Sequence, residues 1–115
     1  MTEVFGLARP ELDVALWYSL TLCTEHPGAL PVTTGHFSCV VEHGLEAPAD
    51  ADTIIVPGWN GEPSPAVLEA MRSSDARLVS ICSGVFLLAA TGRLDGREVP
   101  VARNRPSPRT TKAPR

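Results

Sequence analysis

The sequence predicts an α/β protein with a mainly parallel sheet, and three observations lead to this class. Residues 53–56 and 78–81 are short apolar runs with the length and composition of buried parallel strands. A helical pattern follows each run. The link from the second run to its helix is a sharp turn, Ser-Ile-Cys-Ser-Gly at residues 80–84. The order strand–helix–strand–helix is typical of parallel strands joined by right-handed crossovers.

The start of the chain carries weaker signals. Residues 3–9 have the pattern of the end of a helix, which Pro10 would stop because proline cannot continue a helical hydrogen-bond ladder. Residues 15–23 alternate between apolar and other side chains, which predicts a strand with one favoured face. His-Pro-Gly at residues 26–28 is typical of a turn. We therefore expect a short helix and then a strand before this turn.

A second alternating stretch follows the turn. Residues 36–43 place Phe37, Cys39 and Val41 on one side, which predicts a strand near a sheet edge. Residues 48–52 are expected to form a loop that leads into the first buried strand. This part of the chain should therefore supply an outer strand to the sheet.

The two helices of the second half have clear boundaries. Ser64 is a good N-cap and Pro65 a good first helical residue, so a helix should run from there to about residue 74. Its apolar face is formed by Val67, Leu68 and Met71. Residues 85–90 are apolar almost all round, which predicts an interior helix, and Gly92 should close it.

Cys82 is the candidate reactive residue. Small neighbours allow the strained backbone of a sharp strand-to-helix turn, and the helix N-terminus favours the thiolate form. Gly58 follows the first buried strand as Cys82 follows the second. Ligands of parallel sheets bind at the carboxyl ends of strands, so both positions are expected to meet at one site.

Composition limits the class further. The 115 residues make one domain at most, with 43% hydrophobic content, and no apolar window approaches the roughly 18 residues of a membrane span. The start lacks the pattern of a secretory signal. Three widely spaced cysteines fit neither a disulfide framework nor a zinc site, which favours a reducing compartment. We therefore expect a cytoplasmic protein without a membrane segment.

Charge is distributed unevenly. Through residue 96, four basic residues stand against twelve acidic ones, a net charge of −8, whereas residues 97–115 carry six basic residues and one acidic residue, a net charge of +5. The end is also rich in proline and poor in large apolar side chains, so it cannot continue a core. Two interpretations stay open: an arm that binds nucleic acid and an unselected tail.

Several segments together resemble the ThiJ/PfpI family. They are residues 51–58, the helix start at residues 64–65, the cysteine turn at residues 79–89 and the Leu-Asp-Gly-Arg segment at residues 92–97. The resemblance is strongest to the subgroup fused to AraC-type transcription factors, the GlxA-like regulators, which residues 3–6 also resemble. The family implies a class I glutamine amidotransferase-like fold, a flavodoxin-like three-layer sandwich with a nucleophile-elbow turn, here incomplete.

The resemblance also implies roles for residues of this chain. Cys82 matches the nucleophile-elbow cysteine, and the backbone N–H groups near Gly58 and Trp59 and at Ser83 match oxyanion-binding positions. Together with Gly84 these residues form the predicted ligand-binding set, with no metal and no cofactor. Ser83 stands where protease-type members carry histidine, and Trp59 stands where enzymatic members carry a second glycine.

The family's first strand, with its acidic residue, would lie before the start of this chain. We therefore interpret residues 1–98 as a partial ThiJ/PfpI domain and residues 99–115 as a basic, Pro/Arg-rich disordered tail, read out of frame. The three histidines are expected on the surface, and the other two cysteines on sheet faces, as small apolar residues: His26, His36, His43, Cys23 and Cys39.

The expected function is that of a partial ligand-sensing domain of an AraC-type, GlxA-like transcriptional regulator. A small molecule would bind near Cys82, and DNA would be bound only through a helix-turn-helix domain outside this chain. A homodimer fits the resemblance. The absence of a base beside Cys82 argues against an enzyme. Two alternatives stay open: a stand-alone cysteine enzyme, isonitrile hydratase-like or glyoxalase-like, and a nonfunctional truncated product.

Overall fold

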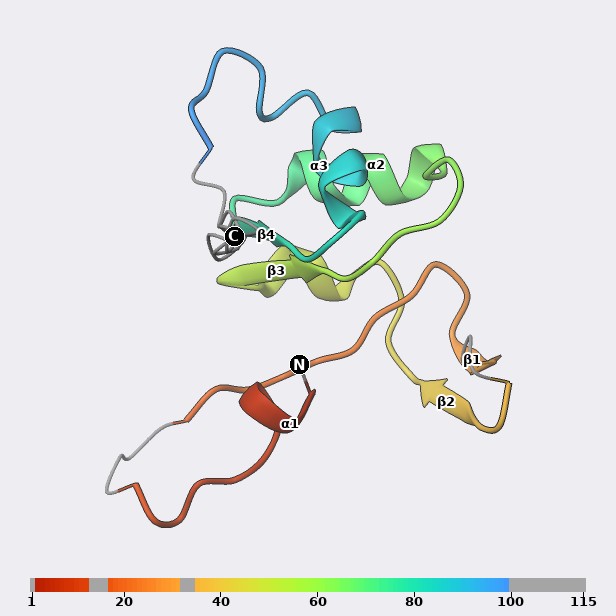
Figure 1. Ribbon diagram of the computed structural model, residues 1–115, viewed down its shortest axis with the longest axis vertical. Helices are drawn as coiled ribbons and strands as arrows, with labels where there is room; N and C mark the ends of the chain where they lie inside the picture. Colours follow the sequence, from red (N-terminus) through yellow and green to blue (C-terminus); the bar gives the residue numbers. More distant parts are fainter. Residues whose placement is uncertain (1, 13–16, 32–34, 100–115) are drawn as a thin grey trace, which may run out of the picture.

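The computed structural model describes residues 2–12, 17–31 and 35–99. Within these residues the chain forms two separate two-stranded sheets, one antiparallel and one parallel (Figure 1). The parallel sheet and the two longer helices make an α/β unit, so the α/β class predicted from the sequence is confirmed at this level. None of the helices in the described part is long and apolar enough to cross a membrane.

The α/β unit has the predicted order of elements. Strand β3 (Thr53–Val56) pairs in parallel with β4 (Arg77–Ser80), and helix α2 (Pro65–Ser73) connects them. Helix α3 (Gly84–Ala90) follows β4 after the cysteine turn. Both helices lie on the same side of the two strands in Figure 1. Strand β4 begins and ends one residue earlier than the strand 78–81 that the sequence predicts.

The predicted boundaries of the helices are confirmed by their hydrogen bonds. The Ser64 hydroxyl accepts a hydrogen bond from the Val67 N–H at 3.2 Å, and Pro65 is the first helical residue. Gly92 follows α3 with a φ of +75°, a backbone conformation that favours glycine. Its N–H donates to the Ala89 carbonyl at 3.0 Å, which closes the helix.

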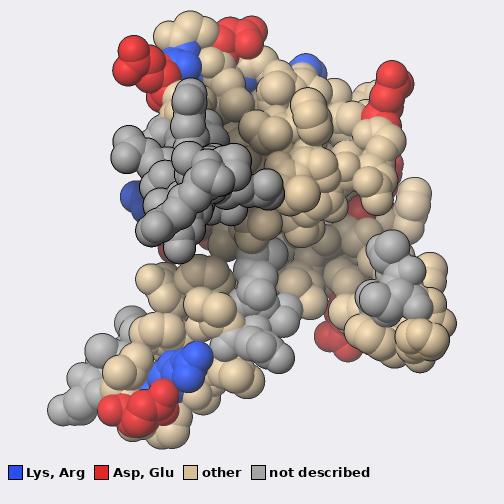
Figure 2. All heavy atoms as spheres, in the orientation of Figure 1, with Lys and Arg blue, Asp and Glu red and all other residues tan. Residues whose placement is uncertain are grey.

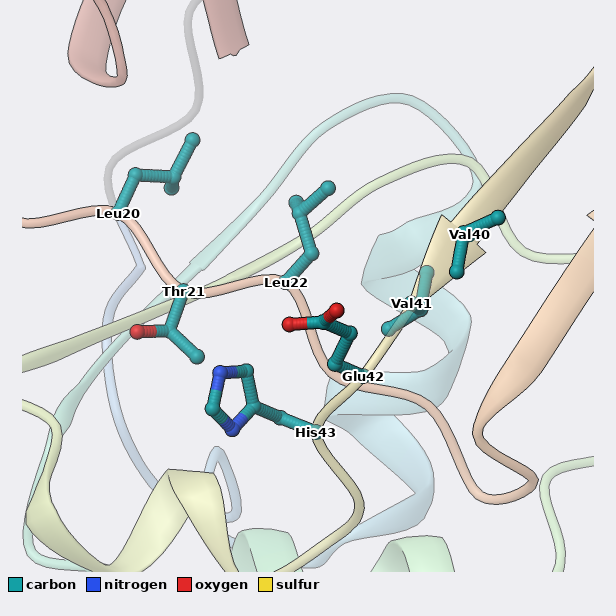
Figure 3. A pocket seen from close by; sticks show the side chains of 7 residues that line it. All are labelled: Leu20, Thr21, Leu22, Val40, Val41, Glu42 and His43. Atoms are coloured by element: carbon teal, nitrogen blue, oxygen red, sulfur yellow. The ribbon is translucent and has the colours of Figure 1, made fainter.

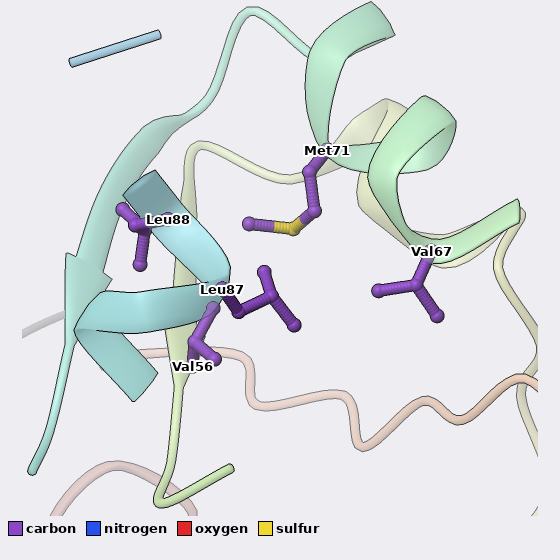
Figure 4. Close-up of a cluster of buried hydrophobic side chains, with 5 residues drawn as sticks. All are labelled: Val56, Val67, Met71, Leu87 and Leu88. Atoms are coloured by element: carbon purple, nitrogen blue, oxygen red, sulfur yellow. The ribbon is translucent and has the colours of Figure 1, made fainter. Parts of the chain in front are cut away.

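Five buried side chains form the core between the helices and the parallel strands (Figure 4). They are Val56, Val67, Met71, Leu87 and Leu88. The prediction that α3 is interior on all sides was wrong, because Phe86 is 73% exposed whereas Leu87 beside it is 1% exposed. The helix buries only the stripe that faces β3 and β4, since nothing in the described part covers its other side.

Two arginines join the ends of the helices to each other. The Arg72 side chain, in the last turn of α2, donates to the carbonyls of Thr91 at 3.0 Å and Ala90 at 3.2 Å. Arg93 donates to carbonyls at the end of α2 and beyond it, those of Met71 at 3.1 Å, Ser74 at 2.8 Å and Ala76 at 3.3 Å. Because the last carbonyls of a helix lack helical partners, these hydrogen bonds satisfy carbonyl groups at the C-terminal ends of both helices.

The first half of the chain departs from prediction more. Helix α1 (Thr2–Phe5) ends well before Pro10. The predicted strand 15–23 was wrong for its described residues, because 17–22 adopt no regular structure and Cys23 makes only an isolated bridge with His43. Residues 15 and 16 lie outside the described part. Alternation alone produced this error, since a strand also requires a neighbouring strand along its length.

Strands β1 (Gly28–Pro31) and β2 (Ser38–Val41) form an antiparallel pair. The predicted strand 36–43 is shorter in the structure, and it belongs to a sheet separate from that of β3 and β4. Cys39 and Val41 are more buried than Val40, as the alternation predicted, but Phe37, predicted on the same side, lies outside the strand and is 65% exposed. The predicted loop at residues 48–52 was wrong in part: Ala47–Asp50 form a short 3₁₀ helix, and the Pro48 carbonyl accepts a hydrogen bond from the Ser74 hydroxyl at 2.9 Å.

Large apolar side chains remain exposed in several places. In the orientation of Figure 2, broad uncharged surface separates the charged side chains. Among the exposed residues, Ile81, Val85 and Phe86 surround the cysteine turn in sequence. The turn is therefore flanked in sequence by exposed apolar side chains.

Candidate functional site

The site is the turn between β4 and α3. Cys82 has a φ of +52°, and it is the one non-glycine residue of the described part with a positive φ. Residues other than glycine rarely adopt this left-handed backbone conformation, which costs about 1–2 kcal/mol. Two hydrogen bonds hold the turn, from the Ile81 N–H to the Val56 carbonyl at 2.9 Å and from the Gly84 N–H to the Ile81 carbonyl at 3.0 Å. The backbone therefore makes a sharp, strained turn from strand to helix at Cys82.

Gly84 permits the close approach of this turn to β3. A Cβ atom at Gly84 would overlap the Pro57 carbonyl oxygen and would lie 2.6 Å from the Val56 carbonyl oxygen. The residue is buried, so it lies under the turn and not on the exposed side of the site. Glycine is needed here because no side chain fits between the first turn of α3 and the end of β3.

Ser83 links the carboxyl ends of the two strands. Its hydroxyl oxygen accepts a hydrogen bond from the Trp59 N–H at 2.9 Å. A Cβ atom at Gly58 would meet the same oxygen at 3.6 Å, an ordinary contact distance. The structure thus brings Gly58, Trp59 and Ser83 together beside Cys82 and Gly84, as the order of strands predicted.

The bond to Ser83 also limits what Trp59 can do. Its backbone N–H matches an oxyanion-binding position in the resemblance, but in this structure that N–H is already bonded to the Ser83 oxygen. The Trp59 side chain packs against the core cluster, and its buried indole N–H has no hydrogen-bond partner in the described part. Trp59 is therefore a packing residue at the edge of the site. In the sequence, the one signal for the hydrogen bond between Trp59 and Ser83 was the serine directly after the cysteine.

The Cys82 thiol is exposed and makes no hydrogen bond with any described residue. No histidine follows His43 in the sequence, so β3, α2, β4 and α3 contain none. All three histidines are exposed and belong to the first half of the chain: His26, His36 and His43. No group of three His, Cys, Asp or Glu residues within the described ranges is placed to hold a metal ion. Among the described residues, the Cys82 thiol therefore has neither a histidine nor a hydrogen-bonded base beside it.

Cys23 lies in a different environment, beside the bridge to His43. Cys23 is an exposed residue, but its thiol is partly shielded from water, which raises the pKa of the thiol, and the negative charge of Glu46 raises it further. The pKa of Glu46 is itself lowered, because its carboxylate accepts hydrogen bonds from its own N–H and from the Gly44 N–H, the latter at 2.7 Å. At neutral pH Cys23 therefore holds less thiolate than an ordinary cysteine.

We expect alkylation of Cys23 at pH 8 to be slower than that of an ordinary cysteine and its rate profile to lie at higher pH, because thiolate is the reacting form and the pKa of the Cys23 thiol is raised. Replacement of Glu46 by Gln should shift the rate profile to lower pH. The matched control is Glu62→Gln, which removes a charge from the loop after β3. Iodoacetamide labelling of the Cys39→Ser, Cys82→Ser chain as a function of pH measures both profiles. Equal profiles for the two variants would contradict the role of Glu46.

Comparison with known proteins adds no relative to this description: no protein-family model matches the chain, and no significant match is found among curated proteins or solved structures.

Proposed function

We propose that the chain is a ligand-sensing domain of the ThiJ/PfpI type, in which Cys82 contacts a small molecule without catalysing its conversion. The observation that carries the proposal is the exposed thiol at the strained turn, which makes no hydrogen bond with a base in the described part of the chain. The β3–α2–β4 order and the turn that follows support a flavodoxin-like arrangement, with this unit as part of the sheet.

Sensing fits the site better than turnover for two reasons. A cysteine hydrolase or hydratase needs a group that moves protons, and the described surroundings of Cys82 offer none. It also needs backbone N–H groups free to stabilise a developing negative charge, whereas the Trp59 N–H is engaged by Ser83. An exposed thiol can still contact a ligand or add reversibly to a carbonyl carbon.

As in the regulators that the sequence resembles, the bound molecule would alter DNA binding through a helix-turn-helix domain outside these 115 residues. The turn is suited to such a signal, because Ser83 connects it to Trp59 and Trp59 packs against the core. A change at Cys82 can thereby reach the side chains between the two helices. The expected partners are one small molecule, DNA through the further domain, and a second copy of the chain.

The test is whether compounds bind to the chain without being consumed. We would incubate the 115-residue protein with short-chain aldehydes, amides and carboxylates and analyse it by native mass spectrometry. The proposal predicts a one-to-one complex with at least one class, weakened at least about tenfold, or about 1.4 kcal/mol, by Cys82→Ala and retained by the control Cys39→Ala. Failure to retain any compound would contradict it.

The stand-alone enzyme makes the opposite prediction. Methylglyoxal or cyclohexyl isocyanide would then disappear at a rate that depends on Cys82 and rises with protein concentration. The sensing proposal predicts that both compounds persist equally with the wild-type chain and with Cys82→Ala. Chromatographic measurement of the remaining compound separates the two functions.

A further inference from the structure

A second site lies away from the cysteine turn, between the irregular segment 20–22 and the end of β2. A cavity of about 240 Å³ opens there, lined by four apolar side chains and three polar ones. The apolar wall is formed by Leu20, Leu22, Val40 and Val41. The three polar side chains are those of Thr21, Glu42 and His43. In Figure 3 the Glu42 carboxylate and the His43 imidazole lie on one side of the cavity, below the Leu22 side chain, whereas the Thr21 hydroxyl points away from them.

The polar groups of this cavity form no hydrogen bond with a described residue, although the charge of His43 acts on the Glu46 carboxylate. The Glu42 carboxylate forms no ion pair or hydrogen bond there, and neither the Thr21 hydroxyl nor the His43 imidazole forms a hydrogen bond. All three residues are exposed. A carboxylate at the edge of an apolar wall, with an imidazole nearby, can recognise a ligand with one charged end and one hydrocarbon end.

Charge determines which kind of ligand fits. No lysine or arginine is among the described residues that line the cavity, so its formal charge comes from Glu42. The chain through residue 96 has a net charge of −8, and such an excess attracts cations and repels anions. The cavity is small and open to solvent, so it suits a small ligand whose charged end stays partly hydrated.

We propose that this cavity binds a small primary alkylammonium ion. The Glu42 carboxylate pairs with the ammonium group and accepts a hydrogen bond from it. The alkyl chain lies against Leu20 and Leu22, where it removes apolar surface from water. This site is independent of Cys82 and does not depend on the proposed sensing function.

An NMR titration of the full ¹⁵N-labelled chain tests the proposal. The probe is 3-methylbutylamine, and two matched compounds control for charge: the neutral 3-methylbutan-1-ol and the anion 4-methylpentanoate. We expect saturable shifts of the backbone N–H signals of Leu22, Val41 and His43 with the amine. The alcohol should bind about three- to fivefold more weakly, as expected for loss of one partly exposed ion pair, and the anion should not saturate.

Two variants locate the charge that is recognised. Glu42→Gln should weaken amine binding about three- to fivefold and bring it to the level of the alcohol. Glu69→Gln removes an equal charge from the exposed face of α2 and should leave the affinity unchanged. Equal affinities for amine and alcohol, equal effects of the two variants, or shifts that do not saturate would each overturn the proposal.

Discussion

Replacement of Gly84 by valine should destabilise the protein by about 3 kcal/mol. The new Cβ would lie 2.6 Å from the Val56 carbonyl oxygen and would overlap that of Pro57. Both atoms belong to the backbone at the end of β3, so relief requires α3 to move away from the sheet. Urea unfolding followed by far-ultraviolet circular dichroism measures the change in the free energy of unfolding.

The matched control for this variant is Gly58→Ala. Its added methyl group would meet the Ser83 hydroxyl oxygen at 3.6 Å, an ordinary contact, and the φ of Gly58 lies outside the left-handed region. We expect a change of less than about 1 kcal/mol for this substitution. If the two glycines tolerated substitution equally well, the close approach of the turn to β3 would be refuted.

Replacement of Leu87 by alanine should cost about 2–5 kcal/mol. Leu87 is 1% exposed and lies at the centre of the cluster between the helices and the parallel strands (Figure 4). Truncation removes buried methyl groups and leaves a cavity that the neighbours Val56 and Met71 fill only in part. The same urea experiment measures the loss.

The neighbouring residue Phe86 provides the comparison. It loses more atoms on replacement by alanine than Leu87 does, but it is 73% exposed, so we expect a change within about 0.5 kcal/mol. This pair distinguishes an amphipathic α3 from the interior helix that the sequence alone suggested. Comparable losses at both positions would show that the outer face of α3 is also packed in solution.

The α/β unit was predictable because its signals are local. Ser64 and Pro65 mark the start of α2 through a hydrogen bond and a fixed φ, both of which lie within one helical turn. Gly92 marks the end of α3 for the same kind of reason. Strands β3 and β4 were recognisable as short apolar runs between these signals, to within one residue.

The first half of the chain was less predictable because its structure depends on partners distant in sequence. The alternation at residues 15–23 is compatible with a strand, yet in the structure Cys23 forms only a single bridge, with His43. Likewise, an all-apolar helix such as α3 is interior only if other elements cover each of its faces. Neither condition can be read from the composition of the segment itself.

The candidate site shows the same division. The position of Cys82 followed from small residues between a strand and a helix, and the structure has the strained φ that such a turn requires. The bond from the Trp59 N–H to Ser83 joins residues 24 positions apart, so the sequence could place them at one edge but could not pair them. The cavity beside Glu42 lies between the irregular segment 20–22 and the end of β2, and no sequence motif marks it.

Competitive labelling of the three thiols tests the central claim that the turn presents Cys82 to small molecules. The folded chain would be treated with less than one equivalent of iodoacetamide at pH 8, and the labelled peptides would be quantified by mass spectrometry. Cys39 is half-buried, and burial and Glu46 raise the pKa of Cys23. We predict that Cys82 carries more label than Cys23 and Cys39 combined, and that this preference disappears in urea. Preferential labelling of Cys23 or Cys39 in the folded chain would contradict the account.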